Sequence, residues 1–578
     1  MNTKDLEEKY EWLFIAIPVF ITAVLWFGTT QVLYSADDYQ YLHHFAPIRS
    51  IGDFFKQFYT ADPNSLYWRP LASGLAVTDF LMWGWNGMGF HVTNFILHLI
   101  CTVVIYFTAK NIFKLSPILS SSAMLGFGCA ASHESNLLWA AGRTDSLATI
   151  FILAALLAEQ HFRQHNKMLW KMYGLLFFLL AMLSKEIGIF VIPLIVIVFD
   201  LAGKQNFSAK AKRAFFGIFP YCILLALIII YRSQFVTSLP SQSDVIGIHS
   251  IRSLAMNSIY TIGYTLIPLD FETGTLLLNH YKMPLLILSI IIGAITIFTL
   301  LKLAKKNGYS RYLMPLFFAF VTGFFTLESF ERWRVYLPSV GIFIFCVVIA
   351  YDIFFWLNKK YLKGLFAAAL LLLFGFHTLR VVNAEQNWRE ASHELQKLKE
   401  EIKPILAAHP ERPLKLLFLT KPAKLGGAPL MQLALTDFLS QAELERTNDA
   451  SLVTGGKPYD GIEGEPAVSL YTTEENKNFS GLSVEKINDS SYRVSVTNDS
   501  QIKLIPAINK EEGIAKRDQE FKDGDTLRSD LFLLIFEKTE KVTAQRIRVE
   551  IIDRSYLPLY YIEGKWHADN ADGTDFHR

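Results

Sequence analysis

Cysteine is scarce in this chain, with four among 578 residues. All four lie inside apolar runs, and residues 383–578 contain none. A disulfide framework is therefore excluded for that last part of the chain. The four positions are Cys101, Cys129, Cys222 and Cys346.

Three further sequence signatures are missing: a nucleic-acid-binding stripe, a glycine-rich nucleotide loop and the positive start of a signal peptide. No basic stripe with interleaved aromatics is present, so nucleic acid is not expected as a partner. Gly426-Gly427 is too short to form a glycine-rich nucleotide loop. The leader Met1 to Glu11 carries four carboxylates against two lysines. A cleaved signal peptide begins with a positive region, so we expect the first apolar segment to stay in the protein.

Long apolar runs, by contrast, are abundant. The chain is 52% hydrophobic and 14% aromatic, and runs of about 20 apolar residues are long enough to cross a bilayer as helices. The sequence therefore predicts an α-helical integral membrane protein with about eleven transmembrane helices. The candidate spans are 12–33, 90–110, 115–132, 146–160, 168–184, 187–203, 214–231, 282–303, 311–327, 335–357 and 364–382.

Charges between the spans predict the orientation, because Lys and Arg accumulate in short cytoplasmic loops. Basic clusters occupy every second connection: Lys110/Lys114, Arg163/Lys167/Lys171, Lys204/Lys210/Lys212/Arg213, Lys302/Lys305/Lys306/Arg311 and Lys359/Lys360/Lys363. The alternate connections are richer in carboxylates or aromatics. We expect the N-terminus inside and these alternate connections outside.

Residues 383–578 form a second predicted domain. They carry 26 Lys+Arg and 33 Asp+Glu, whereas residues 1–382 carry 29 and 20. Short β-branched or alternating segments between turn residues predict strands, and Ala428 to Glu445 reads as a helix. We therefore predict a multispanning membrane domain, 1–382, followed by a soluble α+β domain, 383–578, with a mostly antiparallel sheet. An odd number of spans places this second domain outside.

Two adjacent carboxylates, Asp37 and Asp38, follow the first apolar segment directly. Ionisable residues at a membrane exit are functional candidates. A carboxylate there can act as a general base toward a hydroxyl group, and we predict this catalytic role for Asp37 or Asp38. The alternatives are that the pair caps the helix end in water, or that a divalent metal is held there with His43 or His44.

Several motifs occur in a recognisable order. Tyr67-Trp68-Arg69-Pro70-Leu71 is followed by Gly89-Phe90-His91-Val92-Thr93-Asn94, then by Trp139-Ala140-Ala141-Gly142-Arg143-Thr144-Asp145. Leu183-Ser184-Lys185-Glu186, the run from Glu331 to Gly341, and Asn387-Trp388-Arg389 come next. This order resembles the transmembrane O-mannosyltransferases that carry tetratricopeptide repeats, and their bacterial relatives, over about residues 30–390.

The resemblance implies a GT-C-type fold and an inverting glycosyltransferase that takes a sugar from a polyprenyl-phosphate carrier on the non-cytoplasmic face. Two departures concern the acceptor. The repeats expected after Trp388 are replaced by the acidic domain, and the His-Pro-x-His-x-Glu pattern of the family is reduced to Ser132-His133-Glu134-Ser135. The implied acceptor is a protein or an envelope glycan.

A polyprenyl phosphate leaving group calls for cations, and guanidinium binds phosphate oxygens with two parallel donors. Arg332 and Arg334 stand in a short outer loop, and Lys185 stands in another. We predict these three residues as the donor phosphate site. In the alternative, each loop only ties helix ends together through pairs with neighbouring glutamates.

The remaining candidates are polar or aromatic residues that could bind the sugar or the acceptor. They lie in the predicted outer loops, except His91, which lies at the start of the predicted span 90–110. A Trp can stack on a pyranose face while carboxylates accept from its hydroxyls. An Arg143–Asp145 helix cap explains two of them equally well. The full set is Arg69, His91, His133, Glu134, Trp139, Arg143, Asp145 and Glu186.

The sequence thus predicts a membrane glycosyltransferase of a bacterial inner membrane, with the acidic domain in the periplasm or outside the cell. Its expected partners are the bilayer, a polyprenyl-phosphate-linked sugar, and a protein or glycan acceptor. A transporter or flippase of a lipid-linked saccharide is the alternative, because a polar cavity between spans serves transport too. A sensor on a membrane anchor is a third interpretation, although eleven spans exceed what anchoring needs.

Overall fold

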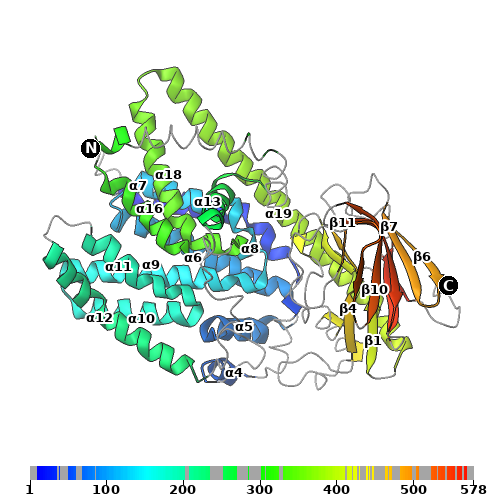
Figure 1. Cartoon of the computed structure of the whole chain (residues 1–578). Coiled ribbons are helices and arrows are strands. Elements are labelled where there is room, and N and C mark those ends of the chain that lie inside the picture. The colour runs from blue at the N-terminus through cyan, green and yellow to red at the C-terminus, as the bar shows by residue number, and fades with distance from the viewer. Residues whose placement is uncertain are drawn as a thin grey trace. The chain divides into compact units, whose positions relative to one another are not determined.

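The computed structural model (Figure 1) describes most of the chain. The described residues are 9–34, 38–39, 50–59, 68–84, 86–201, 207–234, 251–269, 281, 284, 301–305, 308–324, 330–410, 413–419, 421–425, 428–429, 438–439, 442, 446–447, 462–466, 468–471, 482–496, 503–506, 522–529, 531–540, 543–552, 556–562 and 565–568.

The chain divides into two compact units. The first comprises Met1–Gln31 and Arg49–Glu385, and the second comprises Val32–Ile48 and Gln386–Arg578. The last helix, α19 (Lys360–Ala408), contributes residues to both. We call the first the membrane unit and the second the sheet unit.

The membrane unit is helical throughout its described part. Its elements are α2 (Glu11–Leu25), η1 (Phe27–Gln31), α4 (Gly52–Lys56), α5 (Pro70–Trp83), α6 (Gly87–Asn111), α7 (Pro117–Gly128), η2 (Ala131–His133), α8 (Glu134–Leu137), η3 (Ala140–Gly142), α9 (Arg143–His165), α10 (Met168–Ser184), η4 (Glu186–Phe190), α11 (Val191–Ile195), η5 (Val196–Leu201), α12 (Phe207–Arg232), α13 (Ile251–Leu266), α16 (Ser310–Thr322), η6 (Arg332–Val335), α18 (Tyr336–Trp356) and the first half of α19.

Among the described residues, five helices are long and apolar enough to cross a membrane. They are Gly87–Asn111, Ala140–His165, Lys210–Arg232, Arg332–Trp356 and Lys360–Ala408, and Glu11–Leu25 and Met168–Ser184 are shorter apolar helices. These helices support an integral membrane protein. Predicted spans overlap helices at ten of the eleven positions, whereas nearly all of span 282–303 lies outside the described residues.

Three details of the structure differ from the predicted organisation. Two are helices between predicted spans: α4 and α5 lie between 12–33 and 90–110, and α13 lies between 214–231 and 282–303. The predicted span 187–203 is not one regular helix, because η4, α11 and the π-helical turn η5 follow one another there. A hydropathy window detects apolar runs but not such changes in helix type, and it misses α5 and α13, whose sequences are interrupted by polar residues.

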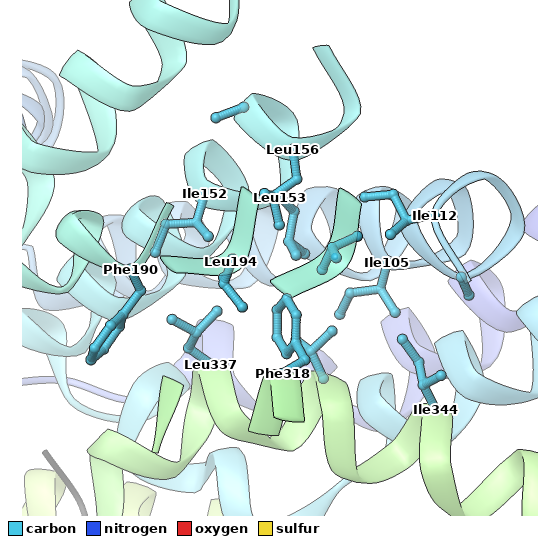
Figure 2. Close-up of a cluster of buried hydrophobic side chains, with 14 of the residues drawn as sticks. Ile105, Ile112, Ile152, Leu153, Leu156, Phe190, Leu194, Phe318, Leu337 and Ile344 are labelled. Atoms are coloured by element: carbon cyan, nitrogen blue, oxygen red, sulfur yellow. The ribbon is translucent and has the colours of Figure 1, made fainter. Parts of the chain in front are cut away.

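The buried core of the membrane unit lies where α6, α9, α11, α16 and α18 meet. Figure 2 shows its side chains, which include Ile105, Leu153, Leu194, Phe318 and Ile344. Close helix contact needs small residues in a membrane, where lipid removes most of the hydrophobic driving force. Gly341 of α18 is one, since a Cβ there would stand 2.5 Å from the Pro315 carbonyl oxygen of α16.

The sheet unit holds two sheets. One has the strand order β13-β12-β1-β4, in which β1 pairs in parallel with β12 and β4. The other follows the path β3-β2-β5-β8-β11-β10-β9, with β7 paired to β11 and β6 paired to β7, and its pairs are antiparallel except β2 with β5. The predicted α+β region is thus present, and its pairing is mostly antiparallel.

The strand bounds are β1 (Leu414–Phe418), β2 (Lys421–Leu425), β3 (Ala428–Pro429), β4 (Ile462–Pro466), β5 (Val468–Tyr471), β6 (Leu482–Asn488), β7 (Ser491–Val496), β8 (Lys503–Pro506), β9 (Thr526–Arg528), β10 (Phe532–Glu540), β11 (Thr543–Ile551), β12 (Leu557–Ile562) and β13 (Lys565–Ala568). The predicted helix Ala428 to Glu445 is wrong at its start, where β3 forms. Pro429 fits there because β3 ends the sheet path, and an edge strand tolerates proline. Most of the remaining predicted helix lies outside the described residues.

Candidate functional site

One end of the helices in the membrane unit gathers charged residues. The first group surrounds the turn between α10 and η4. Lys185 is extended there, with φ −162° and ψ 152°, and ends α10. Gly188 permits the turn, because a Cβ at that position would lie 2.7 Å from the Met182 amide nitrogen. Lys185 and Glu186 are therefore held together at one helix end.

Both residues of this turn form ion pairs with distant elements. Lys185 Nζ donates to Asp145 Oδ2 at 2.6 Å. Glu186 Oε2 accepts from Arg69 Nε at 3.0 Å and Nη2 at 2.8 Å. Arg232 Nη2 lies 3.3 Å from Glu186 Oε1. Glu186 is thus shared by two guanidinium groups.

The protonation behaviour of the turn follows from these contacts. Burial lowers the pKa of the Lys185 ammonium, and Asp145 offsets part of this effect. Burial opposes ionisation of Glu186 as well, but Arg69 and Arg232 outweigh it and hold the pKa of its carboxyl below the usual range. Glu186 is therefore an ionised acceptor at neutral pH.

Arg69 owes its place to the residue after it. Pro70 begins α5 at a position where a missing amide hydrogen costs nothing. Arg69 therefore stands at the start of α5. Next to it, the Trp68 ring packs against Tyr231 near the end of α12, with ring centroids 5.6 Å apart. This contact brings the end of α12, where Arg232 lies, to the same place.

The second group centres on Glu134, which begins α8. Arg380 Nη2 lies 2.8 Å from Glu134 Oε2, and Arg332 Nη1 lies 3.4 Å from Oε1. The Tyr264 hydroxyl donates to Oε1 at 3.1 Å. The Glu134 side chain is 3% exposed, against 21% for Arg332 and 14% for Arg380. Two guanidiniums again share one carboxylate.

The Trp-Ala-Ala-Gly-Arg motif folds back on α8. Gly142 makes this possible, since a Cβ there would stand 2.5 Å from the Ser135 carbonyl oxygen. Trp139 then lies beside Trp333, with ring centroids 5.3 Å apart. Asn136 Nδ2 donates to the Trp333 carbonyl at 3.2 Å. The two predicted outer loops that carry Glu134 and Arg332 are therefore packed together.

Arg143 and Asp145 occupy the first turn of α9, not a loop, and they contact different partners. Arg143 is fully buried and pairs with Asp79 of α5. It also donates to the carbonyls of Ala140 at 3.0 Å and Phe90 at 3.1 Å. Asp145 pairs with Lys185. These partners hold α5, α6 and α9 together, and sugar binding by Arg143 stays a prediction.

His91 and His133 are both buried. His91 Nδ1 lies 3.3 Å from the Leu137 carbonyl oxygen, and His133 Nε2 lies 3.0 Å from Ser339 Oγ. Burial, together with the neighbouring rings of His98 and His377, holds the pKa of His133 well below its usual value. His133 is therefore a neutral hydrogen-bonding group at physiological pH.

The structure describes one of the two predicted catalytic carboxylates, Asp38. Asp37 lies outside the described residues. Asp38 is buried and belongs to the sheet unit, where the neighbouring Tyr39 ring contacts Phe438 at 5.4 Å. The charged groups described above all belong to the membrane unit. The base role of this pair stays a prediction.

No cluster of three or more metal-binding side chains occurs within the described part of the chain. His43 and His44, the other residues of the metal alternative, lie outside it. Arg334 is described and half-buried, and its amide donates to the Glu331 carbonyl at 2.9 Å. Its predicted contact with phosphate stays a prediction, as do the roles of the other site residues.

Four residues of the site escaped the sequence argument: Asp79, Arg232, Tyr264 and Arg380. Asp79 and Arg380 stand inside apolar runs, and a lone charge in such a run is itself a signal of function or pairing. Arg232 follows the last residue of a predicted span. Tyr264 carried no signal, because it lies between the predicted spans 214–231 and 282–303.

Comparison with known proteins supports the resemblance. No protein-family model matches the chain. The chain is 25% identical over 318 residues to a protein O-mannosyl-transferase of Caenorhabditis elegans, which covers 51% of this chain and 44% of that protein. The predicted resemblance to O-mannosyltransferases is confirmed, although the chain spans less than half the length of this relative.

Two crystal structures of ArnT from Cupriavidus metallidurans are also similar in part. The apo state aligns with a TM-score of 0.43 at 14% identity, covering 84% of this chain and 96% of that one. The state bound to undecaprenyl phosphate aligns with a TM-score of 0.40 at 13% identity, covering 82% and 96%.

Proposed function

We propose that the chain is a membrane glycosyltransferase that moves a sugar from a polyprenyl-phosphate donor to a hydroxyl of a protein or glycan acceptor. One observation carries the proposal: two carboxylates at the same end of the helices, Glu134 and Glu186, are each shared by two arginines. In the ion pairs of each group, two guanidiniums face one carboxylate, so the positive charges outnumber the negative ones by one. A phosphate anion fits such a surplus, because guanidinium binds phosphate with paired donors.

The reaction is a displacement at the anomeric carbon. A base takes the proton of the acceptor hydroxyl, whose oxygen forms the new bond to that carbon. The bond from the carbon to the phosphate oxygen breaks, and polyprenyl phosphate leaves with the electron pair. Arginines placed at the leaving oxygen stabilise the negative charge that develops there. Inversion at the anomeric carbon follows from a single displacement.

Among the predicted groups, Arg332 and Lys185 belong to this charged end, together with Arg69, Arg232 and Arg380. Asp37 or Asp38 supplies the base in this proposal. Trp139 and Trp333, packed against each other beside the Glu134 group, offer an aromatic surface for a sugar ring. Mannose is the first sugar to test, because the relative from Caenorhabditis elegans is named for it.

The test uses the purified full chain in phosphatidylcholine vesicles, whose outer leaflet can be sampled separately from the inner one. Undecaprenyl-phosphate mannose and undecaprenyl-phosphate glucose, each labelled in the sugar, are supplied with a mixture of serine- and threonine-rich peptides. We expect labelled peptide and released undecaprenyl phosphate in equal amounts. Movement of intact labelled donor between leaflets, without any release of undecaprenyl phosphate, would favour the flippase alternative and contradict the proposal.

The proposed face of the reaction is non-cytoplasmic, with residues 383–578 on that side. The basic connections at the other helix ends support this orientation. In a bacterial host, a C-terminal alkaline phosphatase fusion should be active and a fusion after Lys167 inactive. The opposite pattern would reverse the orientation.

A further inference from the structure

A second charged region lies at the opposite end of the same helices. α9 begins at Arg143 beside the site just described, and it ends at His165. α10 runs back from Met168 to Ser184. A cavity of about 730 Å³ opens between the end of α9, the start of α10, η5 and α12. Figure 1 shows α9, α10 and α12 as neighbouring helices.

Glu159, Arg163 and Lys171 line this cavity and form an ion network with Asp200. Glu159 and Asp200 are fully buried. Arg163 donates to Glu159 Oε1 at 2.8 Å and to Asp200 at 2.5 and 3.2 Å. Lys171 Nζ lies 2.8 Å from Glu159 Oε2 and 2.8 Å from the Gly217 carbonyl. Charges in such a place are expensive, and they are functional candidates by default.

Two local features keep this network in place. Asp200 lies in η5, a π-helical turn, and such turns are frequent at functional sites. Gly217 leaves room for the arginine, because a Cβ there would lie 2.6 Å from Arg163 Nη2. A larger residue would therefore displace the guanidinium from Asp200.

The cavity wall carries more positive than negative charge. Lys114 and Arg213 line it together with Arg163 and Lys171, whereas its network contains two carboxylates. Arg213 Nε lies 2.9 Å from Asp200 Oδ1 and its side chain is 42% exposed. Lys114 is exposed, and it forms no ion pair with any other described residue. The wall therefore has cationic capacity left for an anion.

The surroundings of the cavity are apolar and exposed. Met168 and Phe216 line it and are 64% and 63% exposed. Leu169, Met172 and Phe215 beside them are 57%, 60% and 57% exposed. In an integral membrane protein such side chains face lipid. A ligand in this cavity would contact cations with one part and apolar side chains with another. A phospholipid, with an anionic headgroup and acyl chains, fits both surfaces, whereas a free ion fits only the first.

We propose that this cavity binds the phosphodiester headgroup of an anionic phospholipid, with the acyl chains against the exposed apolar residues. Basic pockets between transmembrane helices on the cytoplasmic side are suited to such headgroups, and this end carries the basic connections. The site is separate from sugar transfer. It fixes the ends of α9, α10 and α12 whether or not the proposed reaction is correct.

The test measures binding of short-chain lipids to the detergent-purified full chain. Dioctanoyl phosphatidylglycerol should bind at least about tenfold more tightly than dioctanoyl phosphatidylcholine. Each removed cation should weaken phosphatidylglycerol binding about fivefold, and Lys114→Gln with Arg213→Gln about 25-fold. The matched control is Lys167→Gln with Lys212→Gln, two exposed lysines that do not line the cavity but adjoin the lining residues Met168 and Arg213 in the sequence.

Loss of Arg213 could disturb folding, because Arg213 pairs with Asp200. Lys114→Gln alone is then the deciding variant, because Lys114 has no ion pair to lose within the described residues. Its Tm without lipid should equal that of the unmodified chain. Equal binding of both lipids, or an equal loss in the control variant, would overturn the proposal. Inorganic phosphate competing as well as phosphatidylglycerol would show a soluble anion site instead and would also overturn it.

Discussion

Arg380 Nη2 lies 2.8 Å from Glu134 Oε2, across 246 positions of the chain. This pair ties α19 to the short helix α8. Because Arg332 and Tyr264 reach the other carboxylate oxygen, four elements of the membrane unit meet at one buried side chain. Glu134 is therefore as much a structural centre as a candidate binding residue.

Replacing Glu134 by Gln removes the charge that two arginines share. A buried pair broken on one side typically costs about 3–5 kcal/mol, and the partial exposure of both arginines reduces this figure to about 1–3 kcal/mol. We expect a clear fall in Tm in detergent. Glu400→Gln is the control, since Glu400 is 54% exposed and pairs with Lys403 on the same helix. Equal Tm values for the two variants would contradict the structural importance of Glu134.

Gly142 allows the motif around Trp139 to fold back on α8. Gly142→Ala would press a Cβ against backbone atoms of Ser135 and Asn136. Backbone cannot swing away as a side chain does, so we expect a loss of about 1–3 kcal/mol and a lower Tm. Gly375→Ala is the matched control, because nothing lies within 4 Å of the added Cβ. A lower Tm in the control alone would be inconsistent with this account.

Much of the membrane unit could be predicted because apolar runs report helices directly. The span 168–184 coincides with α10, and 335–357 differs from α18 by one residue at each end. The weaker predictions concern segments that are apolar without forming one regular helix, or helical without being apolar throughout. The chain at 187–203 is apolar but changes helix type twice, and α13 carries enough polar residues to resemble a loop.

The sequence predicts which residues belong to the candidate site better than it predicts which of them form ion pairs. Arg69 and Glu186 were predicted separately, and the structure pairs them. Arg143 and Asp145 were considered as partners of each other, yet Asp79 and Lys185 take those places. Neighbours in sequence are visible in a motif, whereas a partner 64 or 40 positions away depends on how helices pack.

Acid should weaken the Glu186 group. Arg69 and Arg232 hold the folded pKa of Glu186 below that of an unfolded Glu, which is about 4.3. The folded state therefore gains stability from this residue above that pH and loses it as the pH falls through the lower folded pKa. Tm measured from pH 6 to 3 should drop in this acid range. Arg69→Gln raises the folded pKa of Glu186 toward the unfolded value, so the drop in Tm should be smaller in this variant, and an unchanged profile would contradict the pairing.

The base prediction concerns Asp37 and Asp38. Asn at the catalytic position should reduce sugar transfer by about 10²- to 10⁴-fold, the usual contribution of a general base. Because Asp38 is buried, its Asn variant must also be compared by Tm, so that loss of folding is separated from loss of chemistry. Near-normal transfer in both single variants would exclude this pair as the base.

Arg332 offers the most specific test of phosphate binding. Lys at this position keeps the charge but loses the paired donors, so affinity for undecaprenyl-phosphate mannose should fall even in Arg332→Lys. Arg332→Ala should fall further, by about 10- to 150-fold, because a hydrogen bond to a charged group contributes about 1.5–3 kcal/mol. The same pair of substitutions at Arg380 shows whether both arginines of the Glu134 group share the phosphate.

In the alternative, these arginines only tie helix ends together through Glu134. The Lys variants should then bind donor normally, and the Ala variants should lose Tm with little change in affinity. Donor binding and Tm measured on the same four purified proteins separate the two accounts. Arg163→Lys is a useful fifth protein, since it weakens an ion network at the far end of α9 without touching the Glu134 group. Unchanged donor affinity in the four Arg332 and Arg380 variants would remove this group from the donor site.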